Sequence, residues 1–139
     1  MKNFWFYTNV FKGCPDFLVK KIKKSGFQSL NHVQVSIVIN YAPELIKYLD
    51  VSSLGEEAIT TILSQHPELN NYFDLTQLRG NMISHILSFH PHLHSLFDLS
   101  KLDNFDIIFL LLEQPELAEF LNLSVLDNTD LDYLENLLN

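Results

Sequence analysis

Histidines are the residues of this 139-residue chain best suited to hold a transition metal. Four of the six histidines lie within ten residues, and such clustering can mark a zinc or copper site. These four are His85, His90, His92 and His94. However, His66 and His90 each directly precede a proline, as Gln114 does, and a histidine at a helix end interacts well with the terminal carbonyl groups. We therefore expect no bound metal.

Paired carboxylates could supply acid–base catalysis or a calcium site. Glu56 and Glu57 are adjacent, and further acids crowd towards the C-terminus. No loop alternates oxygen ligands with the glycine that a calcium loop needs, and catalysis requires two carboxylates in a cleft with pKa values pushed apart. The pairs Asp103-x-x-Asp106 and Asp127-x-x-Asp130 instead have the spacing of N-terminal helix caps. We therefore expect no enzyme activity and no catalytic residue.

Basic and thiol chemistry is concentrated near the N-terminus. The basic run consists of Lys20, Lys21, Lys23 and Lys24. It is interpreted as a solvated helix face, as a patch for phosphate or acidic lipid, or as a contact for the acidic end of a second copy. Cys14 is the single cysteine, so an internal disulfide and a cysteine-rich metal cluster are excluded. No cofactor is expected, and a reducing cytoplasmic setting fits this cysteine usage.

Charge is distributed unevenly along the chain, whose formal net charge is −8. Residues 1–30 hold six lysines and one acid, whereas the remainder holds three bases and 16 acids. This balance argues against direct nucleic-acid binding, which needs a broad basic face, and favours a protein partner with a basic surface. Apolar residues make up 47% of the chain, enough for a packed core. No run approaches the roughly 18 apolar residues of a membrane span, and no signal peptide is expected.

Prolines recur every 24 residues, at positions 43, 67, 91 and 115. A leucine follows each proline after two and after eleven residues, an acid or amide after seven, and a hydroxyl residue after nine. The second half of each unit carries apolar residues spaced by three and four, which share one face of a helix. This pattern predicts an all-α, right-handed solenoid in which each repeat contains two helices.

The repeat extends from the prolines towards the N-terminus. Pro15 and Pro43 are 28 residues apart, which places an insertion near Ser25-Gly26. Tyr7, Val10 and Phe11 fill the helical positions of a leading half repeat. We therefore predict a single domain over 1–139. Its parts are a half repeat at 1–14, a longer repeat at 15–42 and four regular repeats at 43–66, 67–90, 91–114 and 115–139.

The 24-residue period and the junctions His66-Pro67, His90-Pro91 and Gln114-Pro115 resemble the leucine-rich-variant repeat. The resemblance covers residues 15–139. It implies a curved array in which a short helix alternates with a longer α-helix, and it implies a binding scaffold without catalytic residues. The arginine expected near the start of the longer helix is absent, as is the cysteine cluster of the iron–sulfur site that accompanies this repeat type.

Apolar residues in the C-terminal repeats interrupt a helical face that is polar in the first regular repeat. The interrupting residues are Phe89, Ile108, Phe109, Leu112 and Tyr133, at positions where the first regular repeat has Thr60, Thr61, Ser64 and Gln65. They indicate either a thicker core or a partner surface with aromatic anchors and a charged rim. The predicted partner-binding residues are His85, Phe89, Phe109, Leu112, Glu113, Asp130, Asp132 and Tyr133.

The leading hypothesis is a non-catalytic protein-interaction module that offers an acidic, aromatic face to a basic partner. By composition alone, this small acidic chain is similar to phage-encoded inhibitors such as anti-CRISPR proteins, which present carboxylates in place of phosphates. That similarity implies an inhibitor that occludes a basic nucleic-acid-binding surface. The alternatives are a bacterial scaffold or effector fragment, and nucleic-acid or phosphate binding through the lysines at 20–24. Association of copies head to tail or through the aromatic face is a further hypothesis.

Overall fold

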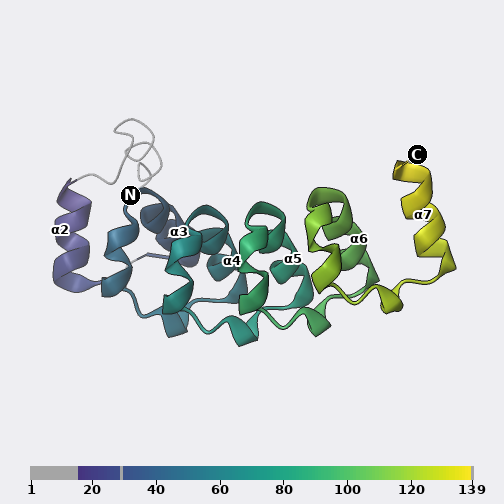
Figure 1. Cartoon of the computed structure of the whole chain (residues 1–139). Coiled ribbons are helices and arrows are strands. Elements are labelled where there is room, and N and C mark those ends of the chain that lie inside the picture. Colours follow the sequence, from purple (N-terminus) through teal and green to yellow (C-terminus); the bar gives the residue numbers. More distant parts are fainter. Residues whose placement is uncertain (1–15, 29, 139) are drawn as a thin grey trace. The chain divides into compact units, whose positions relative to one another are not determined.

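The computed structural model describes residues 16–28 and 30–138, and every regular element in these ranges is a helix. The all-α prediction is therefore confirmed for this part of the chain. The half repeat predicted at 1–14 lies outside the described residues, and the handedness of the array stays a prediction. The chain divides into two compact units, Met1–Asp74 and Leu75–Asn139. Within the regular repeats of each unit, α-helices form one layer and short 3₁₀ helices form another (Figure 1).

The first unit contains the longer repeat and the first regular repeat. Its helices are α2 (Asp16–Ser25), α3 (His32–Tyr41), η1 (Pro43–Tyr48), η2 (Val51–Ser53), α4 (Glu56–Gln65) and η3 (Pro67–Tyr72). The insertion predicted near Ser25-Gly26 corresponds to the end of α2, a ten-residue α-helix in place of short 3₁₀ segments. Gly26 has a φ of 72°, and its N–H donates to the Ile22 carbonyl. This left-handed glycine ends the helix.

The second unit contains the remaining described helices. These are η4 (Leu75–Gln77), α5 (Gly80–Phe89), η5 (Pro91–Leu96), η6 (Leu99–Lys101), α6 (Asn104–Glu113), η7 (Pro115–Phe120), η8 (Leu123–Val125) and α7 (Asn128–Leu138). Asp103-x-x-Asp106 and Asp127-x-x-Asp130 form the predicted caps. In each pair, the first carboxylate accepts from the third following N–H at 2.9 Å, and the second carboxylate reaches back at 3.1 Å.

The first half of a regular repeat is predicted to hold a short helix that begins at proline, followed by a short turn that the acid or amide seven residues later caps. It consists of a six-residue 3₁₀ helix followed by a three-residue one. Proline starts the first segment at a position where its missing N–H costs nothing. Asp98 then accepts from the N–H and the hydroxyl of Ser100, at 3.1 and 2.6 Å, and starts the second segment. Because a new turn begins after every few residues, no segment is long enough to form an α-helix. Short helical segments of this length commonly adopt 3₁₀ geometry.

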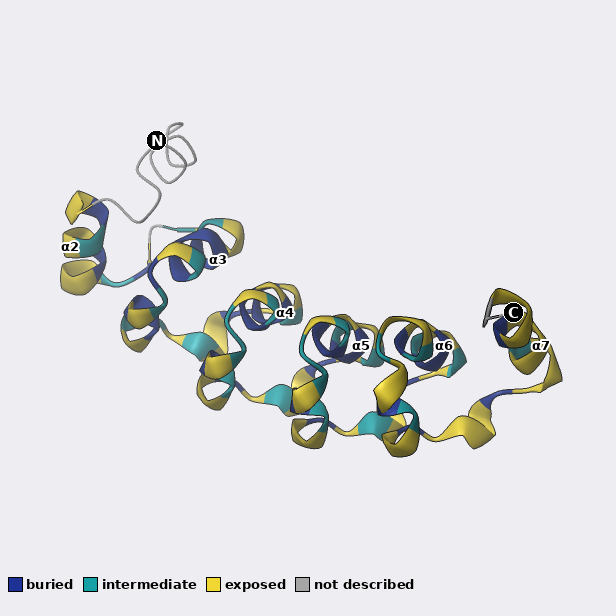
Figure 2. Cartoon of the chain, turned by 45° about the horizontal axis from the view of Figure 1, so that its top comes forward, coloured by how far each residue is buried: buried dark blue, intermediate teal, exposed yellow. Residues whose placement is uncertain are grey.

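The core lies between the two layers, where the helices turn their buried sides towards each other (Figure 2). All leucines two and eleven residues after the prolines at 43, 67, 91 and 115 are buried. They are Leu45, Leu54, Leu69, Leu78, Leu93, Leu102, Leu117 and Leu126. In α5, Ile83, Ile86 and Leu87 are each at most 1% exposed. The apolar columns read from the sequence are therefore the core columns of the fold, except that Leu131 in α7 is 48% exposed.

Gly80 allows the backbone of η6 to approach the start of α5. A Cβ built at Gly80 would overlap the Lys101 carbonyl oxygen and lie 2.9 Å from Asp106 Oδ2. Because backbone has little room to move, we expect Gly80→Ala to destabilise the protein by about 1–3 kcal/mol in urea unfolding. Gly55, at the start of α4, has nothing within 4 Å of a built Cβ. Gly55→Ser should instead stabilise by a few tenths of a kcal/mol, since serine is a good N-cap. If the two variants changed the free energy of unfolding by the same amount, the close approach of η6 to Gly80 would be contradicted.

Candidate functional site

Four positions of each repeat lie on the side of the α-helix away from the core. They fall 14, 18, 21 and 22 residues after the proline and span about 100° of the helix circumference. In the second unit, aromatic and aliphatic side chains occupy many of them. We call this set the aromatic face, and it consists of His85, Phe89, Phe105, Phe109, Leu112 and Tyr133.

The side chains of the aromatic face are open to solvent. Phe105 is 74% exposed, Phe89 59% and Tyr133 54%, while Phe109 is 40% exposed. The rings of His85 and Phe89 meet edge to face with centroids 5.3 Å apart. Isolated exposed hydrophobic residues are ordinary, but several on one face mark an interaction surface. Glu113 is also exposed here and adds a negative charge.

The predicted binding residues fall into three groups. His85, Phe89, Phe109, Leu112, Glu113 and Tyr133 are exposed at the four face positions. Asp130 belongs to the cap of α7, where it accepts from the Asp127 N–H at 3.1 Å and lies 3.4 Å from the Asn104 amide nitrogen. Asp132 is exposed, but it occupies the column that is buried in α5 and α6.

Ile108, which the sequence pattern grouped with the interrupted polar face, is in fact buried at 9% exposure. Its counterpart in α5 is Ser84, which is 5% exposed and bonds to the Asn81 carbonyl at 3.0 Å. Ser84 Oγ also lies 3.4 Å from Asp106 Oδ1 on the next helix. This column therefore faces the following helix, and it accepts a small polar or an apolar residue for packing.

Phe105 is the residue of this face that the sequence reasoning missed. It lies 14 residues after Pro91, a position that is polar in the neighbouring repeats at Asn81 and Thr129. The signal was available in the first unit, where Val33 fills the same position and is 62% exposed. Comparison of this single column across the repeats would have found both residues.

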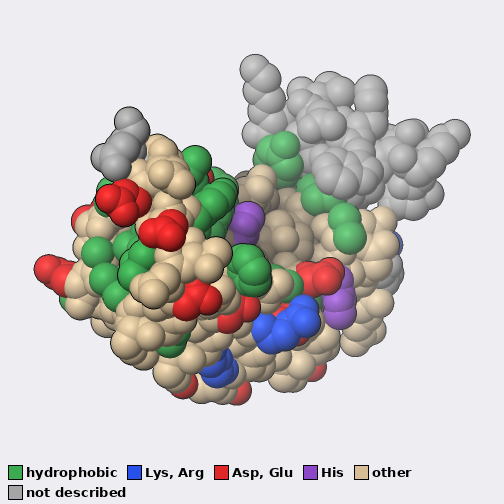
Figure 3. Space-filling view, turned by 90° about the vertical axis from the view of Figure 1, so that its right-hand side faces the viewer, with side chains coloured by type: hydrophobic (Ala, Val, Ile, Leu, Met, Phe, Trp, Pro, Cys, Tyr) green, Lys and Arg blue, Asp and Glu red, His purple; other side chains and the backbone are tan. Residues whose placement is uncertain are grey.

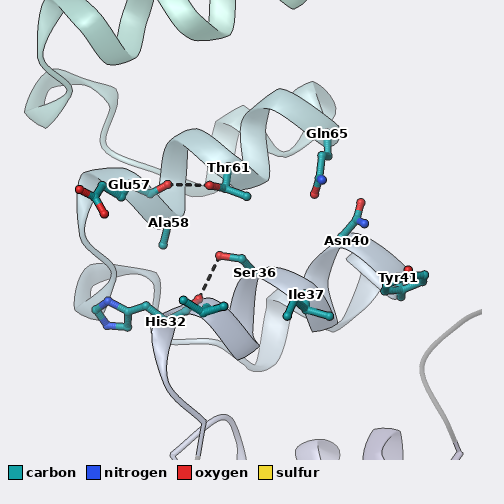
Figure 4. Close-up of a pocket in the computed structure, with 10 residues that line it drawn as sticks. His32, Ser36, Ile37, Asn40, Tyr41, Glu57, Ala58, Thr61 and Gln65 are labelled. Atoms are coloured by element: carbon teal, nitrogen blue, oxygen red, sulfur yellow. Dashed lines mark hydrogen bonds between the residues drawn. The ribbon is translucent and has the colours of Figure 1, made fainter. Parts of the chain in front are cut away.

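In the first unit, the same helical positions line a groove between α3 and α4 with a volume of about 320 Å³ (Figure 4). Val33, Ile37 and Ala58 make its apolar lining. The side-chain amides of Asn40 and Gln65 approach each other at one end, as Figure 4 shows. The Thr61 hydroxyl is already bonded to the Glu57 carbonyl at 3.0 Å. The groove has the size and apolar lining to receive one side chain of a partner.

The residues before Pro67 and Pro115 link neighbouring α-helices. His66 Nε2 lies 2.8 Å from the Asn40 carbonyl at the end of α3, and Gln114 donates to the Ser88 carbonyl of α5 at 2.7 Å. The sequence predicts that residues at this position interact with carbonyl groups at the end of a helix. In the structure, the carbonyls contacted by His66 and Gln114 belong to the α-helix of the preceding repeat. His94 stacks on Phe120 with centroids 3.8 Å apart. Within the described ranges, no group of three or more His, Cys, Asp or Glu residues could hold a metal ion.

The two carboxylates Asp106 and Asp98 should respond to pH in opposite directions. Partial burial raises the pKa of Asp106 above its usual value, and the neighbouring Asp103 carboxylate raises it further. The hydrogen bonds from Ser100 lower the pKa of Asp98. Asp106 therefore contributes stability below the usual value of 3.8 that is lost as pH rises through its higher folded pKa. Asp98 contributes stability above 3.8 that is lost as pH falls.

Asparagine variants separate these two effects in thermal unfolding. Relative to the unaltered protein, Asp106→Asn should be more favourable at pH 7 than at pH 3, because it removes the cost of ionising a half-buried group. Asp98→Asn should show the reverse trend, although Asn122 shows that an amide also starts such a turn. The two melting-temperature differences, measured across this pH range, should therefore have slopes of opposite sign. Slopes of the same sign would contradict these pKa directions.

No protein-family model, curated protein or solved structure matches this chain. Among the helices that the structure describes, none has the length and apolar character required to cross a membrane. The functional argument therefore rests on the aromatic face, the groove and the distribution of charge.

Proposed function

We propose that this protein is a non-catalytic helical-repeat module that binds another protein through the aromatic face of its second unit. The exposure of Phe89, Phe105, Phe109 and Tyr133 on one side of successive α-helices is the observation that supports this function. Protein interfaces concentrate their binding energy in aromatic residues that become buried on association. Packing within the second unit leaves these rings exposed, and binding of a partner would bury them.

The charge of the second unit favours a partner with a basic rim. This unit has two basic residues, Arg79 and Lys101, against ten acidic ones. Opposite charges around an apolar contact speed association and disfavour acidic competitors. Several of the acids are helix caps, including Asp103, Asp106 and Asp127. The acids that do not cap helices are therefore the ones that would recognise a basic protein surface. An inhibitor that covers such a surface on its target is one form of this proposal.

A photo-crosslinking experiment tests this function directly. A benzophenone-bearing amino acid is placed at Phe105, the most exposed side chain of the face, and in a matched variant at Tyr72 on η3 of the first unit. Both positions tolerate a bulky ring because they are exposed. Irradiation in lysate, after nuclease treatment, should give one dominant protein adduct at Phe105 and none at Tyr72. Excess unlabelled protein should abolish this adduct.

The outcomes of the crosslinking experiment separate the candidate functions. A protease-sensitive adduct that weakens with Glu113→Lys at low salt supports a basic protein partner, since this substitution reverses a charge on the face itself. An adduct that disappears on nuclease treatment would point to nucleic acid instead. Identical adducts at both positions, or none at Phe105, would contradict binding through the aromatic face.

A further inference from the structure

One side of α7, which corresponds to the side of α5 that contacts the following repeat, has no partner among the described residues. Asn128, Leu131, Asp132 and Glu135 are spaced by three and four residues and therefore form one stripe. In α5, the residues that correspond to the last three of them are Ile83, Ser84 and Leu87, and all are buried. In α7 the corresponding residues are exposed, and Leu131 is 48% accessible. Acidic and hydrophobic side chains intermingle at this end of the second unit, which faces the viewer in Figure 3.

Helix α2 presents a stripe of opposite charge. Leu18 and Ile22 are its buried residues, whereas Lys20, Lys21 and Lys24 are exposed and share another side of the helix. Among the described residues, no ion pair involves the lysines of α2 or the acids of the α7 stripe.

We infer that copies of this protein associate head to tail, with the basic stripe of α2 in one copy against the acidic stripe of α7 in another. Charge complementarity identifies a second copy as the occupant, because every copy carries both stripes. Leu131, at a position that is buried in α5 and α6, supplies an apolar contact inside this charged surface.

This contact joins two different surfaces, so copies can pair reciprocally or add to one another in series. A repeated contact of this kind produces rings or linear oligomers whose mean size grows with protein concentration. Exposed ion pairs are individually weak and are screened by salt, so association should be weak and strongest at low ionic strength. The aromatic face is not part of this contact, and the inference is therefore independent of the proposed function.

Sedimentation equilibrium of the purified full chain tests the inference. At low salt, the weight-average mass should rise above that of one chain as concentration increases over about a hundredfold range. It should return to the mass of one chain at about 1 M NaCl, where the Debye length is about 3 Å. Lys21→Glu should weaken association at least about tenfold, whereas Lys47→Glu on η1, outside both stripes, should have a much smaller effect. Circular dichroism establishes that each variant is folded.

A charge exchange between two variants gives the decisive result. The variant with Lys20→Glu and Lys21→Glu should be monomeric, and so should the variant with Asp132→Lys and Glu135→Lys. A mixture of the two should associate, because the basic α2 of the second variant meets the acidic α7 of the first, and the acidic α2 of the first meets the basic α7 of the second. A monomer at all concentrations in the unaltered protein would overturn the inference. So would association that persists in both variants, or a mixture that stays monomeric.

Discussion

Replacement of Ile86 by alanine is expected to lower the free energy of unfolding by about 2–5 kcal/mol. Ile86 lies in the middle of α5 and is completely buried. The substitution removes three carbon atoms and leaves a cavity that the surrounding helices cannot fill, since Ile83 and Leu87 beside it are also buried. Leu78, which is equally inaccessible, should lose a comparable amount on replacement by alanine. Urea unfolding followed by circular dichroism measures both effects.

Phe89→Ala is the matched control on the same helix. This substitution removes more atoms than Ile86→Ala, but the Phe89 ring is 59% exposed. We therefore expect it to cost less than about 1 kcal/mol, the range typical of surface positions. A loss as large as that of Ile86→Ala would place Phe89 in the core, and the aromatic face would then be a thickening of that core.

The second large effect concerns binding rather than stability. Phe109→Ala should weaken binding of the crosslinked partner by more than about 1–2 kcal/mol, or about 5- to 30-fold in Kd. Phe109 lies at the centre of the aromatic face, between the α5 residues and Tyr133 in chain order, and it retains 40% exposure in the free protein. The melting temperature of the Phe109→Ala variant should differ little from that of the unaltered protein. Titration of the purified partner by calorimetry provides the Kd values.

Phe120 provides the control for this binding measurement. It is 43% exposed, close to the value of Phe109, but it belongs to the 3₁₀ layer and stacks on His94. Phe120→Ala should therefore leave the Kd unchanged. If both variants bind normally, the partner docks elsewhere on the protein. If Phe109→Ala unfolds the chain, the ring supports the core and is not an anchor.

Some of these features could be predicted from the sequence because they depend on interactions between residues close in the chain. The two caps Asp103-x-x-Asp106 and Asp127-x-x-Asp130 are examples, since each carboxylate bonds to backbone three residues away. The leucines at regular distances from each proline were correctly read as core because one periodic helix face must be buried. The short turn after the first helix of a repeat is a further example, since Asp98 caps it by accepting from the Ser100 N–H two residues later.

The site depends on which side of each helix meets a neighbour, and the sequence leaves that choice open. A stretch as apolar as Phe105–Leu112 predicts a helix but not which residues its neighbours cover. Contact between successive helices decides that Ile108 is buried and Phe109 exposed, although the two are adjacent in the chain.

By itself, the sequence determined the all-helical class, the core columns and the segregation of basic and acidic residues, because periodicity and composition encode them directly. The tertiary structure decided which apolar residues remain exposed, since burial is a property of neighbouring repeats and not of one helix. For the same reason it left Leu131 of α7 exposed in a column that is buried in α5 and α6.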